Sequence, residues 1–258
     1  MTEQMKTKLE NMREFEIFSS LKIPPNCWFI VRLDGKCFSK LTEEMNLKKP
    51  FDEDFKINMV NSVKEVMSKT GAILSYFESD EVSILFNKDS DFFNRRIEKI
   101  NSVLSSMLTA ECMKQDFFKG FLPIFDSRLM VCPTEEDVFN IFKWRLNDSL
   151  RNCLNSFAFW NLFINGKTKK QSEKILNKMK ANEKQELLFK EFGINFNDVE
   201  KWKKNGTFIF IKEIDKEGFN PKENKKVIVK RKIFTEVNKD FKEQKDFFKL
   251  LKGGLNIK

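Results

Sequence analysis

The chain has 258 residues, with 47 Lys or Arg, 38 Asp or Glu, a formal net charge of +9 and no histidine. This length corresponds to one large domain or two closely packed ones. The missing histidine excludes Ser-His-Asp and Cys-His nucleophile arrangements and every His-ligated metal site. Acid–base or metal chemistry therefore depends on Asp, Glu, Lys, Cys, Tyr or main-chain groups.

The cysteines and the N-terminal region indicate the cellular compartment of the protein. The five cysteines are odd in number, and no pair has the spacing of a C-x-x-C motif. This pattern argues against a zinc knuckle, a redox pair or a disulfide framework, and it predicts buried free thiols. Residues 1–22 contain no uninterrupted apolar stretch, so we expect neither a secretory signal nor a membrane span, and no membrane partner. We expect a cytoplasmic protein, with import into an organelle as the alternative.

The positive charge lies at the C-terminal end of the chain. Residues 1–200 carry 30 basic and 30 acidic side chains, whereas residues 201–258 carry 17 and 8. Such a surplus indicates either a binding surface for a polyanion or a solvated lysine-rich face. Charge alone does not separate the two interpretations.

The hydrophobic pattern predicts helices and strands in mixed order, which is typical of an α+β fold. Two prolines end the first helix, and Gly71 ends the second. Asp52 or Asp54 is placed to cap that second helix, and Thr134 with Asp137 forms a variant capping box. In chain order, we expect a helix over 8–22, a strand over 27–31, a helix over 52–70, and two strands joined as a hairpin over 72–77 and 82–86. A helix over 91–114 and a strand over 124–131 follow. The chain should continue with helical segments to about 164, over 169–179 and over 182–192, and end with strands over 208–214 and 226–233.

Acidic side chains stand where predicted strands end. Asp34 follows an apolar strand directly, and Asp80 and Glu81 lie in the turn between two others. Carboxylates on adjacent strands repel one another unless a cation neutralises them, and Mg²⁺ prefers a few carboxylates with substrate phosphates. A two-metal site of this kind serves nucleotidyl transfer, which needs no histidine. The alternative is structural, because Asp-Gly and Ser-Asp-Glu are also common turn sequences.

Groups next to Asp34 suit a nucleotide. Gly35 lets a main-chain carbonyl approach a metal and main-chain amides approach a triphosphate. Lys36, Lys40 and Lys49 would supply positive charge to the phosphates.

Several motifs follow one another along residues 12–211. They are Arg32-Leu33-Asp34-Gly35-Lys36, Lys49-Pro50-Phe51-Asp52, Glu78-Ser79-Asp80-Glu81, Arg95-Arg96 with Lys99, Phe125-Asp126-Ser127-Arg128, Trp144-Arg145, residues 152–160 and residues 184–189. As an ordered set, these motifs resemble the tRNA-histidine guanylyltransferase family, which includes guanylyltransferase-like 3′-to-5′ RNA polymerases.

The resemblance implies a palm-like antiparallel sheet flanked by helices. Residues 1–135 would form the palm-like catalytic region. Residues 136–258 would form a helical and basic region packed against it, which we expect to contact tRNA. The reaction would activate an RNA 5′-monophosphate with ATP or GTP, after which the 3′-hydroxyl of an incoming nucleotide attacks the activated end. The family also suggests a homotetramer, a dimer of dimers.

The resemblance also assigns roles to residues. It implies catalytic Asp34, Asp80 and Glu81, although Glu81 is alternatively a surface acid at a strand end. Two Mg²⁺ ions would be held by Asp34, the Gly35 carbonyl and Asp80. The set expected to bind GTP or ATP is Asp34, Gly35, Lys36, Cys37, Phe38, Ser39, Lys49, Ser79 and Asp80. The set expected to bind RNA or its 5′-phosphate is Arg32, Arg95, Arg96, Lys99, Arg151 and Lys184, for most of which a solvated helix face is the alternative.

Two positions depart from the family pattern. Leu150 stands where guanylyltransferases carry a histidine, and Ser127 replaces a glycine. The first change favours templated 5′-end repair of tRNA over guanylate addition to tRNA-histidine. A non-catalytic RNA-binding protein and a palm-type nucleotide cyclase are the alternatives from other classes.

Overall fold

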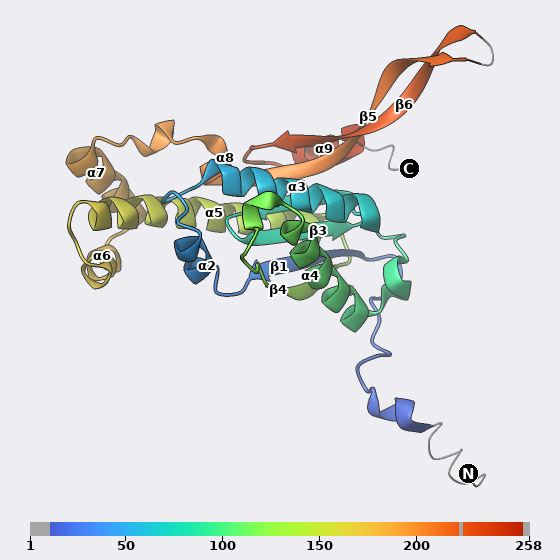
Figure 1. The fold of residues 1–258 in the computed structure, drawn as a ribbon, viewed down its shortest axis with the longest axis horizontal. Coiled ribbons are helices and arrows are strands. Elements are labelled where there is room, and N and C mark those ends of the chain that lie inside the picture. Colours follow the sequence, from blue (N-terminus) through green and yellow to red (C-terminus); the bar gives the residue numbers. More distant parts are fainter. Residues whose placement is uncertain (1–10, 222–223, 255–258) are drawn as a thin grey trace.

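The computed structural model describes residues 11–221 and 224–254, and within them one antiparallel sheet forms the centre (Figure 1). Its six strands run in the order β4-β1-β3-β2-β5-β6. The fold is therefore α+β with an antiparallel sheet, as the sequence predicts. The strands are β1 (Trp28–Gly35), β2 (Leu74–Glu78), β3 (Glu81–Phe86), β4 (Phe125–Cys132), β5 (Thr207–Asn220) and β6 (Lys225–Val237).

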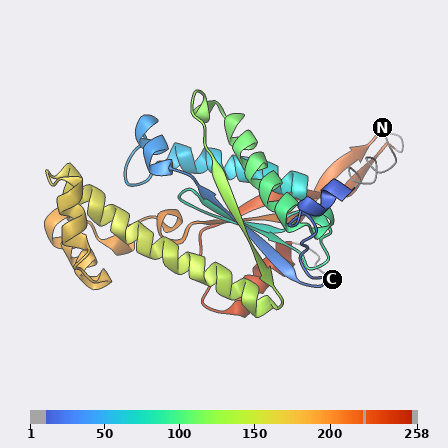
Figure 2. The same cartoon turned by 90° about the horizontal axis from the view of Figure 1, so that it is seen from below.

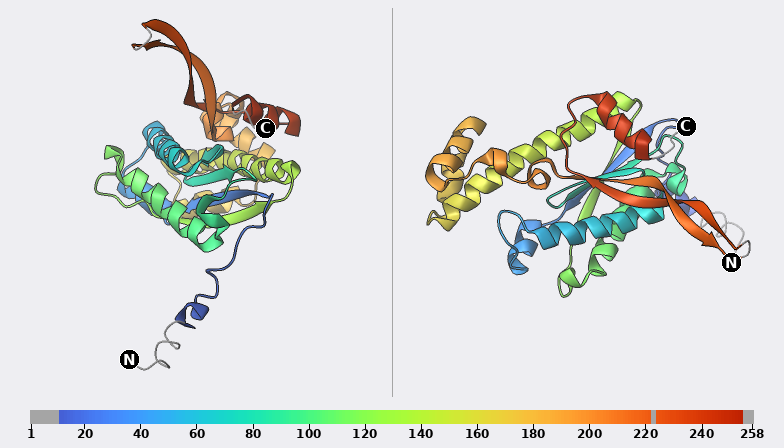
Figure 3. Two further views of the ribbon diagram at one scale, coloured as in Figure 1. Left: turned by 90° about the vertical axis from the view of Figure 1, so that its right-hand side faces the viewer. Right: turned by 90° about the horizontal axis from the view of Figure 1, so that it is seen from above.

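Each face of the sheet buries a separate apolar core, because successive side chains on a strand point to opposite faces. On β1, Val31 packs with helices α3 (Glu53–Thr70) and α4 (Ile97–Met113). The preceding residue, Ile30, points to the other face and packs with α5 (Glu135–Ile164) and α9 (Gln244–Gly254). Helices therefore flank the sheet on both sides (Figure 3).

Helix α5 extends well beyond the sheet and carries a small helical unit on its far half (Figure 2). This unit contains α6 (Lys169–Leu176), α7 (Ala181–Phe192) and α8 (Lys201–Asn205). Its core forms around Leu154, Leu162 and Leu188. The unit leads back into β5, so residues after 136 complete the sheet that the first half of the chain begins.

Local signals in the sequence are confirmed at the element ends. Asp52 caps α3 by accepting a hydrogen bond from the Phe55 amide at 2.9 Å. Gly71 ends this helix with a φ of 72°, a left-handed conformation that favours glycine. Thr134 and Asp137 form the expected capping box before α5. The predicted hairpin is β2–β3, with Ser79 and Asp80 as its two-residue turn.

The predicted helix over residues 8–22 is wrong in the part that the structure describes. Asn11–Phe15 form a short 3₁₀ helix, η1, and residues 17–20 form a turn. Phe15, Ile17 and Phe18 are 78, 65 and 63% exposed, so the burial that would stabilise an amphipathic helix is missing in this described segment. Residues 8–10 lie outside the described residues.

Other predictions need correction in length or number. The helix expected over 91–114 is broken into η2 (Phe92–Arg95) and α4. The late strands β5 and β6 are longer than expected and form a hairpin that projects from the body, which we call the arm (residues 212–234; Figure 1). Helices α2 (Phe38–Glu44), α8 and α9 were not predicted.

All five cysteines are free thiols as predicted, but only three of them are buried. Cys112, Cys132 and Cys153 are buried, whereas Cys27 is half-buried and Cys37 is exposed. Burial raises the pKa of each buried thiol to about 12. In the described ranges, no helix combines the length and apolar character needed to cross a membrane.

Arg95 fixes the break before α4 and is not available for phosphate. Phe93, Asn94 and Arg95 all have left-handed φ values of 48, 54 and 58°, a strained conformation outside glycine. The guanidinium uses all five of its donors on main-chain carbonyl oxygens, at 3.3 Å to Ile23, 3.1 Å to Lys88, 2.7 Å to Ser90, 2.8 Å to Pro24 and 2.8 Å to Cys27. This corrects the assignment of Arg95 to RNA binding.

We expect Arg95→Lys to lower the free energy of unfolding by about 2–4 kcal/mol, because an ammonium cannot replace five directed donors and leaves partly buried carbonyls unpaired. Urea denaturation followed by circular dichroism measures this. Arg151→Lys, whose side chain is 70% exposed, is the matched control and should change stability by less than about 0.5 kcal/mol. Unchanged stability of the Arg95 variant together with weaker RNA binding would restore the phosphate role.

Candidate active site

A row of carboxylates crosses the end of the sheet on its α5 face. Asp34 on β1 is in register with Glu81 on β3 and with Asp126 on β4, and Glu81 is in register with Glu78 on β2. Register partners in antiparallel strands point to the same face. The sheet therefore brings together acidic residues that are far apart in the sequence.

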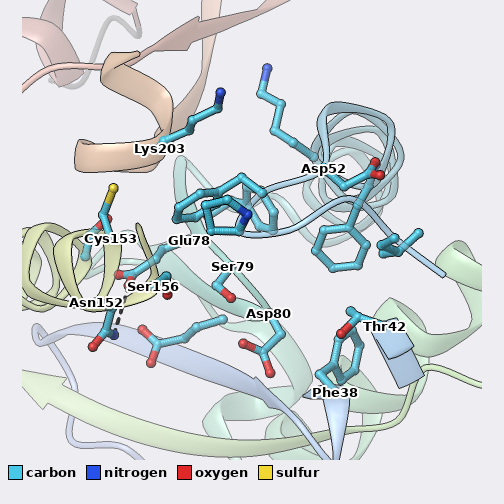
Figure 4. A pocket seen from close by; sticks show the side chains of 18 of the residues that line it. Phe38, Thr42, Asp52, Glu78, Ser79, Asp80, Asn152, Cys153, Ser156 and Lys203 are labelled. Carbon is cyan, nitrogen blue, oxygen red and sulfur yellow. Dashed lines mark hydrogen bonds between the residues drawn. The ribbon is translucent and has the colours of Figure 1, made fainter. Parts of the chain in front are cut away.

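Asp34, Glu78 and Glu81 form part of the wall of a cavity of about 650 Å³, whereas Asp126 lies outside it. The turn residues Ser79 and Asp80 lie at its centre, with Phe38 and Thr42 on one side and Asn152 on the other (Figure 4). The remaining walls come from residues 47–52, α3, α5 and α8. The cavity thus lies at the sheet end, and residues from both the N-terminal and the C-terminal half of the chain line it.

Asp34 and Asp80 both line this cavity and interact electrostatically. Burial raises the pKa of Asp80, and the nearby Asp34 carboxylate raises it further, partly offset by hydrogen bonds to the Asp80 main chain and Ser79. A cation between two such carboxylates would relieve their repulsion. In the described ranges, no cluster of three or more acidic or cysteine side chains forms a metal site. Two carboxylates and main-chain oxygens still fit Mg²⁺, which completes its coordination with water and phosphate.

Gly35 is required by its close packing against Phe38, a residue that lines the cavity. A Cβ atom at this position would lie 2.3 Å from the Phe38 ring, which no side chain permits. Phe38 begins α2 after a left-handed Cys37, with a φ of 58°. Of the residues expected to bind a nucleotide in this segment, Phe38 and Ser39 line the cavity, whereas Gly35, Lys36 and Cys37 are not among its lining residues.

Lys49 lines the cavity, and its contact with a nucleotide stays a prediction. Its ammonium donates to the Thr42 hydroxyl at 2.6 Å and lies over the Trp160 ring, 5.5 Å from the centroid. Burial lowers the pKa of Lys49, while Glu43, Asp52 and Asp80 favour its charged form. The side chain is therefore a desolvated cation close to Asp80, which is a suitable partner for a phosphate.

Glu81 is held by two arginines. Arg145 of α5 donates from Nε to Glu81 Oε1 at 2.6 Å, and its NH2 group donates to Asp148 at 2.8 Å. Arg32 Nε approaches the second oxygen of Glu81 at 3.7 Å. Because Arg145 is 5% exposed, this link fastens α5 to the sheet end. In this structure Glu81 is an ion-pair partner, so its catalytic role stays a prediction.

Glu78 is a member of the site that the sequence analysis missed. It is 8% exposed, and burial followed by the charge of Glu81 raises its pKa to about 8. Asn152 donates to its Oε1 at 3.3 Å (Figure 4), while its Oε2 is buried without a hydrogen-bond partner. A glutamate beside a turn carries no sequence signal of burial, because that burial comes from α5.

The predicted RNA-binding residues do not gather in one place. Arg32 lines the cavity. Lys184 of α7 donates to Asn155, a lining residue, at 2.8 Å. Arg151 is exposed and pairs with Asp148. Arg96 and Lys99 flank the start of α4 away from the cavity, with Lys99 over the Phe93 ring.

Two family models match nearly the whole chain. The model described as tRNAHis guanylyltransferase matches residues 9–133, and the model described as Thg1 C terminal domain matches residues 136–249. The chain belongs to the tRNA-histidine guanylyltransferase family. The first model ends at residue 133 and the second begins at residue 136, and the sheet contains strands from both matched regions.

Relatives in this family cover most of the chain. The tRNA(His) guanylyltransferase of Candida glabrata is 35% identical over 215 residues, which are 79% of this chain and 90% of that protein. The crystal structure of the Saccharomyces cerevisiae enzyme matches with a TM-score of 0.70 and 32% identity, covering 77% of this chain and 92% of the other. A bacterial guanylyltransferase-like protein in complex with ATP matches with a TM-score of 0.70 and 29% identity, covering 86% and 91%.

Proposed function

We propose that this protein is a nucleotidyltransferase that adds nucleotides in the 3′-to-5′ direction to tRNA 5′ ends, with ATP or GTP activating the end. The observation that carries this proposal is the shared position of Asp34 and Asp80 in the wall of one large polar cavity. The family's named activity and the ATP and GTP complexes of a bacterial relative support it.

The chain's own groups suit successive parts of a nucleotide. Asp34, the Gly35 carbonyl and Asp80 would hold two Mg²⁺ ions, which supply charge neutralisation at the reacting phosphates when bound. Lys49 is positioned beside Asp80 to contact a phosphate, and Phe38 provides an apolar surface on the α2 side of the cavity. Arg145 and Arg32 hold Glu81 and thereby keep the strand end in place.

The substrate is a tRNA 5′ end that needs repair rather than tRNA-histidine alone. Leu150 stands at the position where the family pattern has a histidine, and a leucine side chain offers no hydrogen-bonding group there. Leu150 is 45% exposed on α5 and is not a lining residue of the cavity. Its substitution leaves the Asp34–Asp80 chemistry intact while removing one means of selecting a particular tRNA.

Assembly and location follow from the same proposal. Free thiols at all five cysteines support a reducing compartment, the cytoplasm. The exposed apolar side chains of Phe15, Ile17 and Phe18 support a contact between subunits, for which such apolar surface is typical, and the homotetramer is what the family resemblance suggests.

The arm carries its basic side chains unequally. Cross-strand register puts Lys212, Lys216 and Arg231 on one face, together with Ile214 and Val229 but with no carboxylate from the described side chains. The opposite face is mixed, because Asp215 and Glu217 share it with Lys226, Lys230 and Lys232. A polyanion is attracted to the first face and much less to the second. We therefore assign tRNA contact to the Lys212–Lys216–Arg231 face.

Replacing either cavity aspartate should abolish nucleotide addition. We expect Asp34→Asn and Asp80→Asn each to reduce incorporation of labelled GTP into 5′-truncated tRNA by at least about 100-fold, because each removes a charge that holds the cation. Asp126→Asn is the matched control: this residue is the register partner of Asp34, but its side chain is 56% exposed and outside the cavity. It should retain activity within about threefold. Full incorporation by the Asp34 and Asp80 variants would contradict the proposal.

The two faces of the arm should respond differently to charge reversal. We expect Lys216→Glu with Arg231→Glu to weaken tRNA binding about tenfold or more and to lower the slope of log Kd against log salt by about two, since two phosphate contacts are lost. Lys230→Glu with Lys232→Glu changes the same charge on the opposite face and should have a smaller effect. Equal effects from both pairs would show that only net charge matters.

A further inference from the structure

Two tryptophans line the cavity without belonging to an apolar core. Trp160 is on α5 and Trp202 is on α8, and both are half-buried. Neither is part of the three apolar clusters that the described residues form, whereas Trp28 lies inside one of them. A large aromatic side chain gains stability mainly by burial in a core, so two half-exposed indoles in a polar cavity need another explanation.

Each indole carries a cation over its face. Lys49 Nζ lies 5.5 Å from the Trp160 centroid, and Lys203 Nζ lies 5.3 Å from the Trp202 centroid. Glu200 holds the second pair, because it accepts hydrogen bonds from both the Trp202 indole N–H and Lys203. Phe51 packs edge-on against Trp202, with centroids 5.9 Å apart. The orientation of this ring is therefore fixed before any ligand binds.

Aromatic faces paired with ammonium groups fit one chemical class of ligand. A nucleobase stacks on an aromatic ring regardless of its identity, and the attached phosphate needs a cation nearby. Lys203 lies on the opposite side of the cavity from Phe38, Thr42 and Asp80 (Figure 4). Lys49, which lies over the Trp160 ring and whose charged form Asp80 favours, connects this wall to the Asp80 region.

We propose that Trp160 and Trp202 form a nucleobase-stacking subsite of the cavity, with Lys49 and Lys203 contacting the phosphates of the same nucleotide. This subsite is separate from the α2 side, where Phe38 and Ser39 lie. It rests on the proposed nucleotidyl transfer and adds a second place for a nucleotide, either a free nucleoside triphosphate or an unpaired nucleotide at the end of the RNA. Both sources share the chemistry of a base with a phosphate.

Equilibrium binding without turnover tests the subsite. Trp160→Ala and Trp202→Ala are compared with the corresponding Trp→Phe variants by isothermal titration calorimetry. The ligands are GTP, inorganic triphosphate, a tRNA acceptor duplex with an unpaired terminal nucleotide, and the same duplex with an abasic terminal nucleotide. Phe189→Ala is the control, because Phe189 is a 63% exposed aromatic outside the cavity.

We expect the alanine variants to bind base-containing ligand about 5- to 100-fold more weakly, the phenylalanine variants to retain most affinity, and base-free ligand to bind unchanged. A loss with GTP assigns the subsite to the triphosphate, and a loss confined to the unpaired terminal nucleotide assigns it to RNA. Equal losses with and without a base, or no loss at all, overturn the inference. Because nothing is incorporated, a wild-type protein that adds no nucleotide would refute the proposed function without changing this result.

Discussion

The electrostatic conflict between Asp34 and Asp80 organises the cavity. One carboxylate ends β1 and the other occupies the β2–β3 turn, and the Asp34 charge adds to burial in raising the pKa of Asp80. Such an arrangement costs stability in the absence of a cation, and a fold optimised only for stability would not contain it. The Lys49 ammonium offsets part of this cost and also creates a place for phosphate.

The second half of the chain supports this site from the opposite side. Arg145 on α5 joins Glu81 to Asp148, and the burial of Glu78 depends on the same helix. Helix α8 contributes Lys203 and Trp202 to the cavity wall. The cavity is therefore formed jointly by the sheet and the helical unit, and its lining residues come from the regions that both family models match.

The sequence predicted what depends on local pattern and what the family motifs identify. The α+β class, the hairpin, the caps of α3 and α5 and the position of Asp80 follow from periodicity, turn chemistry and capping residues. Arg95 was misassigned because its five carbonyl partners come from separate loops that only the fold brings together. Glu78 and Trp202 were missed for the same reason, since their environment comes from distant segments. The predicted N-terminal helix failed for a different reason. Its apolar side chains are exposed rather than packed against the core, and only a short 3₁₀ helix forms there.

The most direct test of the account is a crystal structure of the protein with GTP and Mn²⁺, in which anomalous scattering locates the metal. We predict at least one anomalous peak about 2.0–2.3 Å from carboxylate oxygens of both Asp34 and Asp80, with triphosphate oxygens completing its coordination. A peak bound by neither residue, or the two carboxylates turned toward different partners with GTP present, would contradict the central claim that they share a divalent cation.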